Sequence, residues 1–507
     1  MWRDSEGLAA VPGLLMAVFL AVAAACLGTV DGAADTGPSE PAVAAGGLSV
    51  GRPAGWLPGE TGRIWIPANA LVVLQSLDLT GQRHGYRLRA VSAEECLAGG
   101  PTLSGRVTGA GSVCVARLVL SEAERFGGLL PRDAEFVRSA AAGRSRCFGL
   151  DAGVAGESLG RAEPVGDAVA RRFLLPCFTE TGVREVVEEC ECVSRGEAAA
   201  VYVCGSEEAM VGVEQLREIG EFLSVELGRS GGTLRAAVES QLGEIADVDG
   251  DGVLTVVLAR LDCRDEGLLR GEVPVLGCVR ESDFLSLGVG DGIGGDILYL
   301  DPRGLVGSWG RSLLSHELSH AAVHSRQRSR LERGAGVLEL PGWFHEALAQ
   351  RVEHCVAGPG AGYAVRLESF IRQPQLSAVV QPAWSGWSAG RGGSRAAGVL
   401  FLERSLRKGV CPAELLEECG SFEELLCGLL ERPFVDSLRE WGPAGAIAIA
   451  DVRGADVSEL SATGEWSSGV LQGTGFAIWR SGCSGLELEL DVAADAAVQL
   501  TVISGGE

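Results

Sequence analysis

The sequence is short of positive charge and of histidine. Its 507 residues include 43 Lys and Arg against 67 Asp and Glu, so the formal net charge is −24, and Lys408 is the only lysine. This excess of negative charge argues against nucleic acid or an anionic membrane surface as a partner. Hydrophobic residues make up 46% of the chain, which allows substantial cores, and about two to four domains are expected at roughly 100–200 residues each.

Other familiar patterns are missing as well. No two cysteines have the C-x-x-C spacing, so a zinc site built from cysteines is not expected. A glycine-rich stretch at Leu285–Gly295 has no phosphate-binding lysine and no helical pattern after it. We expect a loop there instead of a nucleotide site. No internal repeat is evident.

The few histidines are concentrated in one region. Of six in the chain, five lie between His316 and His354. His316 and His320 belong to the run LLSHELSHAAVH, with Glu317 directly after the first. On a helix, residues four apart lie on the same face. Both imidazoles are therefore expected to face one point. Apolar residues of the run lie on the opposite side of the helix from the histidines, which is typical of a buried helix.

This spacing is a zinc-binding pattern with a chemical reason behind it. Two imidazoles hold the ion, the ion lowers the pKa of a water to roughly 7, and the glutamate between them serves as general base. Glu317, His316 and His320 therefore predict zinc-assisted hydrolysis, in the first place of a peptide bond. The alternative is a core helix with two hydrogen-bonded histidines. It is less favoured because a chance match is rare in a chain with so few histidines.

A zinc site also needs a third protein ligand. His324 lies one turn further along the same helix, and three consecutive turns, each rising roughly 5–6 Å, cannot converge on one ion. The longer pattern H-E-x-x-H-x-x-G-x-x-H fails as well, because position 323 is valine. We therefore expect His324 outside the set of ligands, either next to them or near the surface.

A second helix offers a better third ligand. Pro341–His354, PGWFHEALAQRVEH, begins with a proline suited to a first helical turn, and Glu346 lies off its apolar side. We predict Glu346 as the ligand. Glu339 and Glu353 are competitors, but Glu339 precedes the proline and Glu353 lies two turns further along.

HELSH followed by W-F-x-E-A-L-A resembles the gluzincin metallopeptidases, and among them the hyicolysin-like secreted peptidases. Two further segments share the resemblance, DVDGDGVLTVVL at Asp247–Leu258 and DILYLD at Asp296–Asp301. The likeness covers Val186–Leu438, about half the chain. It implies a zincin-type domain in which an edge strand pairs with the backbone of the substrate.

The resemblance also implies the roles of individual residues. His316, His320 and Glu346 would bind zinc, and Glu317 would be the general base. Two positions depart from the family: residue 345 is His where Asn is frequent, and residue 347 is Ala where Gly is frequent. His345 would either replace an outer contact to a ligand or compete for the metal.

The aspartate-rich turn has a second interpretation. Asp247, Asp249 and Asp251, followed by Gly252, resemble the start of a calcium-binding loop. The closing acidic position of such a loop falls on Leu258, which cannot bind a cation. A turn that leads into a strand is therefore favoured over a calcium site.

The N-terminus resembles an export signal. Residues 1–7 contain Arg3, and residues 8–28 are apolar with small residues near their end. A cleaved signal is favoured; a lipid on Cys26 in the run AAAC, or an uncleaved anchor, are the alternatives, and contact with a membrane is expected only through one of these. We expect a secreted, cell-surface or periplasmic protein, with residues 1–30 as the signal and 31–54 as a linker.

Export would allow disulfides. Apart from Cys26 the chain has fourteen of its fifteen cysteines left, an even number, so up to seven disulfides are expected. Local candidates are Cys263 with Cys278, and Cys411 with Cys419 or Cys427.

The predicted fold class is α+β. Short alternating strands between glycine-rich turns predict a β-rich domain over residues 55–180. A zinc metallopeptidase domain over 181–442 is expected to open with a hairpin at 184–203 and to have a mostly helical lower half. After a helix at Phe434–Trp441, strand patterns return in a small β-rich module at 443–507. Both flanking modules are expected to be sandwich-like.

The sequence as a whole predicts an exported zinc endopeptidase whose partner is a protein or peptide substrate. One alternative is an aminopeptidase with the same site, although no acidic motif for capturing a free amine stands out. The other is a non-catalytic surface or binding protein. A tetrahedral intermediate needs a hydrogen-bond donor, and the candidates, none of them favoured, are Tyr363, Arg391, Arg395 and His354.

Overall fold

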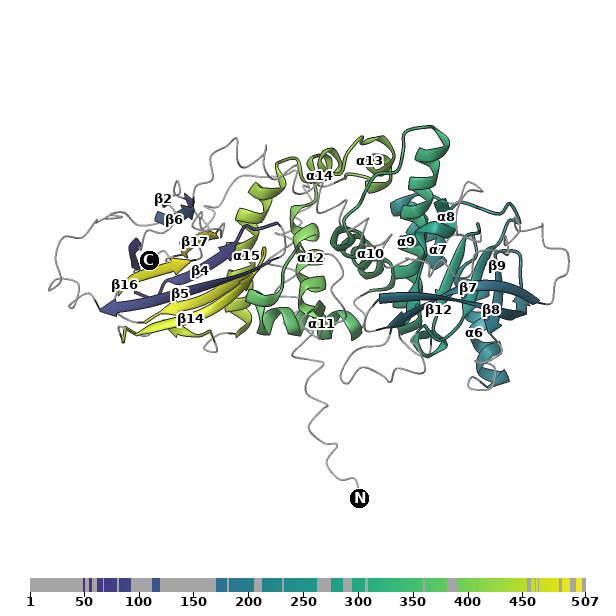
Figure 1. Cartoon of the computed structure of the whole chain (residues 1–507), viewed down its shortest axis with the longest axis horizontal. Helices are drawn as coiled ribbons and strands as arrows, with labels where there is room; N and C mark the ends of the chain where they lie inside the picture. Colours follow the sequence, from purple (N-terminus) through teal and green to yellow (C-terminus); the bar gives the residue numbers. More distant parts are fainter. Residues whose placement is uncertain are drawn as a thin grey trace, which may run out of the picture.

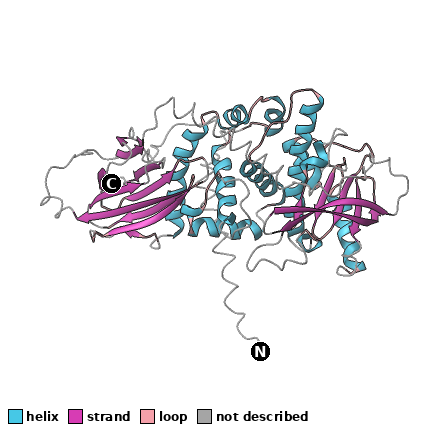
Figure 2. Cartoon of the chain, viewed as in Figure 1, coloured by secondary structure: helices cyan, strands magenta, loops and turns pink. Residues whose placement is uncertain are grey.

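The computed structural model describes residues 49–50, 54–56, 62–92, 112–118 and 170–503, with gaps of which the longest are 262–274, 286–293 and 381–390. The expected signal, which includes Cys26, lies outside the described residues, and so does most of the expected linker. The molecule is elongated, with strands at both ends and helices between them (Figures 1 and 2). The residues described here include no helix that is both long and apolar enough to cross a membrane.

One end of the molecule is a six-stranded sheet in the order β11-β12-β10-β9-β8-β7. Strands β9, β10 and β12 run parallel, and their continuous apolar runs are buried on both faces, as parallel strands require. Antiparallel pairs β7–β8 and β11–β12 lie at the two edges. The bounds are β7 (Ala170–Thr179), β8 (Gly182–Arg195), β9 (Ala199–Cys204), β10 (Leu254–Leu258), β11 (Gly277–Cys278) and β12 (Ile297–Leu300). The hairpin predicted at 184–203 is therefore confirmed.

Helices cover one face of this sheet. On that face the alternate β10 residues Leu254, Val256 and Leu258 pack with these helices in one hydrophobic core. The helices are α6 (Val213–Glu226), α7 (Leu234–Leu242), α8 (Glu281–Leu285), α9 (Trp309–Glu332) and α10 (Gly342–Ala357). A single turn, η1 (Pro302–Leu305), joins β12 to the segment before α9. The strand-to-helix path from β12 therefore places the middle of α9 against the sheet.

The remaining helices extend this core away from the sheet. They are α11 (Ala361–Arg372), η2 (Pro374–Leu376), α12 (Arg391–Ser405), α13 (Pro412–Glu418), α14 (Phe422–Leu430) and α15 (Phe434–Arg453). Aromatic rings join them: Trp343 of α10 stacks on Phe434 at 5.5 Å, and Phe401 of α12 packs against the same ring at 5.3 Å. The mixed helix-and-sheet composition agrees with the predicted α+β class.

The other end of the molecule is a sandwich of two sheets that enclose one core. The orders are β1-β6-β17-β4-β15-β13, with β2 pairing β6, and β14-β5-β16-β3. The early strands are β1 (Ser49–Val50), β2 (Ala54–Trp56), β3 (Gly62–Ile66), β4 (Leu71–Ser76), β5 (Arg83–Ser92) and β6 (Ser112–Leu118). The late strands are β13 (Glu459–Leu460), β14 (Trp466–Gln472), β15 (Phe476–Ser481), β16 (Leu486–Val492) and β17 (Val498–Ile503).

The sandwich combines the two ends of the sequence, which were expected to form separate β-rich modules. Strand β4 lies between β15 and β17, and β5 lies between β14 and β16. Alternation within a strand shows which face is buried but not which partner it pairs with. The last strand of the expected N-terminal module, β7, pairs instead with β8 in the other sheet.

Helix α15 is longer than the sequence predicted, because it passes through Pro443 and ends at Arg453. A proline in a helix leaves the carbonyl four residues earlier without its amide partner. Here Gln499 Nε2 of β17 donates to that carbonyl, Arg439 O, at 3.1 Å, and Gln75 Nε2 of β4 donates to Leu438 O at 2.7 Å. The sandwich thus supplies donors to the helix at the proline.

The disulfide pattern differs from the local pairs expected. Cys190 and Cys204 lie opposite each other on β8 and β9 and are bonded, with a Cα–Cα separation of 4.1 Å. Cys411, Cys419 and Cys427 are free thiols, and so is Cys278. The predicted pairings are therefore wrong. Helix α13 separates residues 411 and 419 by roughly 12 Å of rise, beyond the reach of a disulfide. Cys263 lies outside the described residues.

Candidate metal centre

The predicted zinc-binding run lies in the middle of helix α9 and is buried. His316 and His320 are each 9% exposed and Glu317 is 4% exposed. Small residues allow this burial: Ser319 Oγ donates back to Ser315 O at 2.7 Å, so the hydroxyl is satisfied within its own helix. The sequence therefore places three polar groups inside a core that its leucines and alanines build.

Helix α10 brings the expected third ligand to the same place. Pro341 precedes its first residue in an extended conformation, and Phe344 and Leu348 are buried on its apolar side. Glu346 lies on a different side and faces α9. The helix predicted at Pro341–His354 is confirmed and extends to Ala357.

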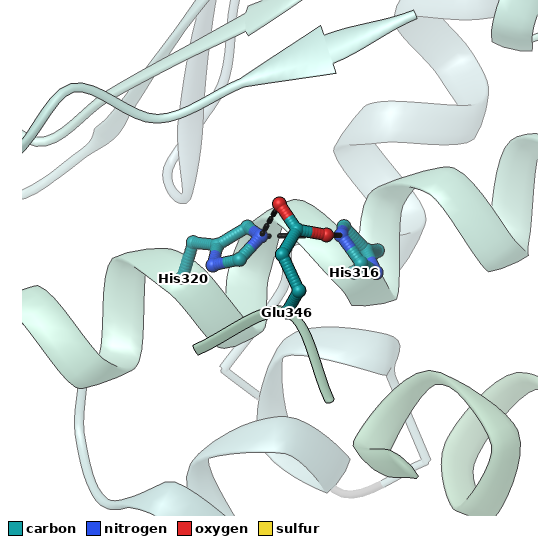
Figure 3. Close-up of side chains that lie close together, drawn as sticks. All are labelled: His316, His320 and Glu346. Carbon is teal, nitrogen blue, oxygen red and sulfur yellow. Dashed lines mark hydrogen bonds and ion pairs between the residues drawn. The ribbon is translucent and has the colours of Figure 1, made fainter. Parts of the chain in front are cut away.

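The three side chains converge, as Figure 3 shows. Glu346 Oε2 lies 3.5 Å from His316 Nε2, Glu346 Oε1 lies 4.0 Å from His320 Nε2, and the two Nε2 atoms are 3.1 Å apart. Ligands at roughly 2.0–2.1 Å from a tetrahedral zinc ion are about 3.3 Å from one another. One donor atom from each residue lies within 4.8 Å of the others, so this group could hold a metal ion.

A second carboxylate orients the first histidine. Glu353 Oε2 of α10 lies 3.1 Å from His316 Nδ1, which leaves Nε2 facing the group. Burial alone would raise the pKa of Glu353, but its hydrogen bond to His316 lowers it. Sequence reasoning weighed Glu353 only as a competing ligand. The structure gives it the supporting contact that metal-binding histidines usually have.

Glu317 is enclosed but not satisfied. Its Oε2 is buried and has no hydrogen-bond partner among the described residues. Burial, together with the charge of Glu346, raises the pKa of Glu317 to about 7. Edge strand β11 lies directly against it, since a Cβ added to Gly277 would be 2.6 Å from Glu317 Cδ. The carboxylate thus has free acceptor capacity beside the histidine pair.

Two arginines lie near the group. Arg395 Nη2 of α12 is 3.4 Å from Glu346 Oε2. Burial alone would raise the pKa of Glu346, but Arg395 and the two histidines hold it well below its usual value. Burial and the charge of Arg395 lower the pKa of Arg366, on α11, to about 10. Arg366 carried no signal in the sequence, because only the packing of α11 on α12 brings it here.

The other sequence candidates have different places. His345 lies between His320 and His324, and its ring centroid is 4.6 Å from that of His320 and 4.8 Å from that of His324. His324 and His345 therefore lie beside the group of three ligands and are not part of it. His354 Nδ1 pairs with Glu403 at 3.0 Å. Glu339 is not part of the group. The side chains of Tyr363 and Arg391 lie outside the described part of the chain.

Comparison with models of known protein families found no match, and neither did comparison with curated proteins.

Proposed function

We propose that the chain is a zinc-dependent endopeptidase. The observation that carries this proposal is the convergence of His316, His320 and Glu346 beside the buried, unsatisfied carboxylate of Glu317. The donor set, two imidazoles and a carboxylate, is one that catalytic zinc sites use, with the fourth position left for water or substrate. A zinc ion held by these residues would supply Lewis acidity toward the scissile carbonyl.

Within this proposal Glu317 moves the proton. It accepts a proton from the attacking water and delivers it to the nitrogen of the leaving amine. Glu353 accepts a hydrogen bond from His316 Nδ1–H. It thereby keeps His316 in the tautomer whose unprotonated Nε2 faces the group. Arg395 is the described side chain best placed to donate to a developing oxyanion, because its guanidinium already reaches Glu346.

The substrate is proposed to bind as an extended peptide along β11. This strand is at the edge of the six-stranded sheet, and its Gly277 borders Glu317. Backbone pairing with an edge strand accepts many side chains. The zincin-type fold and the likeness to gluzincins belong to this proposal. So does export, which the Cys190–Cys204 disulfide supports because such bonds persist in oxidising compartments.

The test is hydrolysis of casein by purified full chain alongside its Glu317→Gln variant. We expect the wild type to hold about one zinc per chain and to cleave casein. The variant should keep its zinc and fold but lose roughly 10²–10⁴-fold in kcat. Glu332→Gln, at the exposed end of the same helix, is the matched control and should be fully active.

The same assay separates the alternatives. If wild type and Glu317→Gln are equally inert although both are folded and zinc-loaded, the peptidase proposal is wrong and a binding protein is favoured. An aminopeptidase would cleave peptides with a free N-terminus and leave their N-acetylated forms intact. An endopeptidase cuts both.

A further inference from the structure

A second group of acidic side chains lies at the turn before β10, away from the histidines in sequence. One carboxylate oxygen from each of Asp247, Asp249 and Asp251 lies within 4.8 Å of the others. Acidic turns are common without a cation, so this clustering by itself decides nothing. The surroundings of Asp249 and Asp296 decide it.

The side chain of Asp249 is buried although one of its oxygens is unsatisfied. Its side chain is 8% exposed, and its Oδ1 has no hydrogen-bond partner in the part of the chain that the structure describes. Its other oxygen, Oδ2, lies 3.5 Å from Arg171 Nη1 of β7. A buried carboxylate oxygen with no donor is costly. A cation among the three aspartates would satisfy it.

The tertiary structure adds a fourth carboxylate that the sequence pattern lacks. The loop pattern ends at Leu258, but parallel pairing of β10 with β12 brings Asp296, the residue before β12, next to the turn. Asp296 is 2% exposed, and its Oδ1 accepts from Val248 N at 3.2 Å. Burial, together with the charge of Asp249, raises the pKa of Asp296 to about 7.

The local charges do not balance. Two guanidinium groups face the turn, Arg171 next to Asp249 and Arg195 of β8 at 3.1 Å from Asp251 Oδ2. When all four carboxylates are ionised, as a bound cation would favour, they exceed the two arginines by two negative charges, which is the charge that one divalent cation supplies. An all-oxygen site of this kind suits a hard cation, and calcium accepts flexible arrangements of carboxylates, whereas magnesium demands a near-ideal octahedron and keeps several waters.

We propose that the Asp247–Gly252 turn binds one calcium ion through Asp247, Asp249 and Asp251, with Asp296 adding a fourth negative charge beside them. The site is structural. It connects the turn to arginines of β7 and β8 and to the start of β12, the strand that leads to helix α9. It does not depend on the chemistry proposed for the histidine centre.

The experiment measures calcium binding to the full chain after chelator treatment and reloading with one equivalent of zinc. Equilibrium dialysis with Ca²⁺ should show one ion per chain, and the thermal midpoint should rise with calcium concentration because the ion binds only the folded state. Magnesium at equal concentration should give a smaller rise. Asp249→Asn should weaken calcium binding at least tenfold without changing the zinc content.

The control is Asp436→Asn, a half-exposed aspartate of α15 that should bind calcium as the wild type does. If Asp249→Asn does not fold, judged by circular dichroism, Asp251→Asn replaces it. Failure of 5 mM calcium to bind the wild type or to raise its midpoint would overturn the proposal. So would equal binding by the folded variant and the wild type. Loss of peptidase activity with calcium binding intact leaves it standing, so the two proposals fail separately.

Discussion

At the scale of the residue, the centre depends on carboxylates in three different roles. Glu346 faces the imidazoles, Glu353 orients one of them, and Glu317 has an oxygen that no described donor satisfies. Their pKa values separate accordingly: positive neighbours lower those of Glu346 and Glu353, while burial raises that of Glu317. Environment thus distinguishes three identical functional groups, which is how acid and base roles are usually assigned.

A substitution of Glu353 tests the orienting role. Glu353→Gln keeps the size of the side chain but removes the charge that fixes the His316 tautomer. We expect the dissociation constant for zinc to rise about 10–100-fold, measured by competition with a chromogenic chelator, with activity restored at saturating zinc. Glu403→Gln, which changes the partner of His354, is the control. Unchanged zinc affinity in the Glu353 variant would show that the contact is only structural.

At the scale of the element, the close approach of β11 to α9 shapes the site. Gly277 is the point of contact, and no larger residue fits without moving the Glu317 carboxylate. The strand is two residues long, so nothing in its local sequence distinguishes it from a loop. Its position follows from pairing with β12, Gly277 opposite Leu300.

Gly277→Ala tests this approach. The added Cβ would lie 2.6 Å from Glu317 Cδ, so the carboxylate must shift. A misplacement of about 1 Å is expected to lower kcat/KM by roughly 100-fold, while the zinc content stays at the wild-type value. Gly85→Ala, in strand β5 with open space around the glycine, should be neutral. Full activity of the Gly277 variant would place the reacting atoms elsewhere.

At the scale of the whole molecule, the two ends of the chain close one sandwich, and the helices and second sheet lie between them in sequence. Gln75 and Gln499 connect the sandwich to α15, and Phe476 of β15 packs on Trp441 of that helix. The sandwich is therefore attached to the helical core by buried contacts and not by a linker alone.

Truncation after Arg453 tests this closure. It removes both neighbours of β4 and both neighbours of β5 and exposes their edges, so we expect aggregation and rapid proteolysis within residues 62–92. Removal of residues 504–507 alone, beyond the last strand, should leave the thermal midpoint unchanged. A soluble 1–453 chain with wild-type zinc content and a single unfolding transition would contradict the shared sandwich.

The sequence by itself determined what depends on spacing. His316 and His320 are four apart on one helix, and Glu346 lies on the polar side of the next, so helical periodicity placed all three. The hairpin at 184–203 and the helix after Pro341 followed from the same kind of pattern. Residues 1–30, on which the export prediction rests, lie outside the described part of the chain.

Only the tertiary structure decided what depends on residues far apart in the chain. The Cys190–Cys204 bond, the path of α15 through Pro443, the joint sandwich, and the positions of Arg366, Gly277 and Asp296 all arise from pairing and packing between distant segments. Local patterns fix which face of an element is buried, because burial has the period of the helix or strand. They carry no information about which partner covers that face, because many partners satisfy the same pattern.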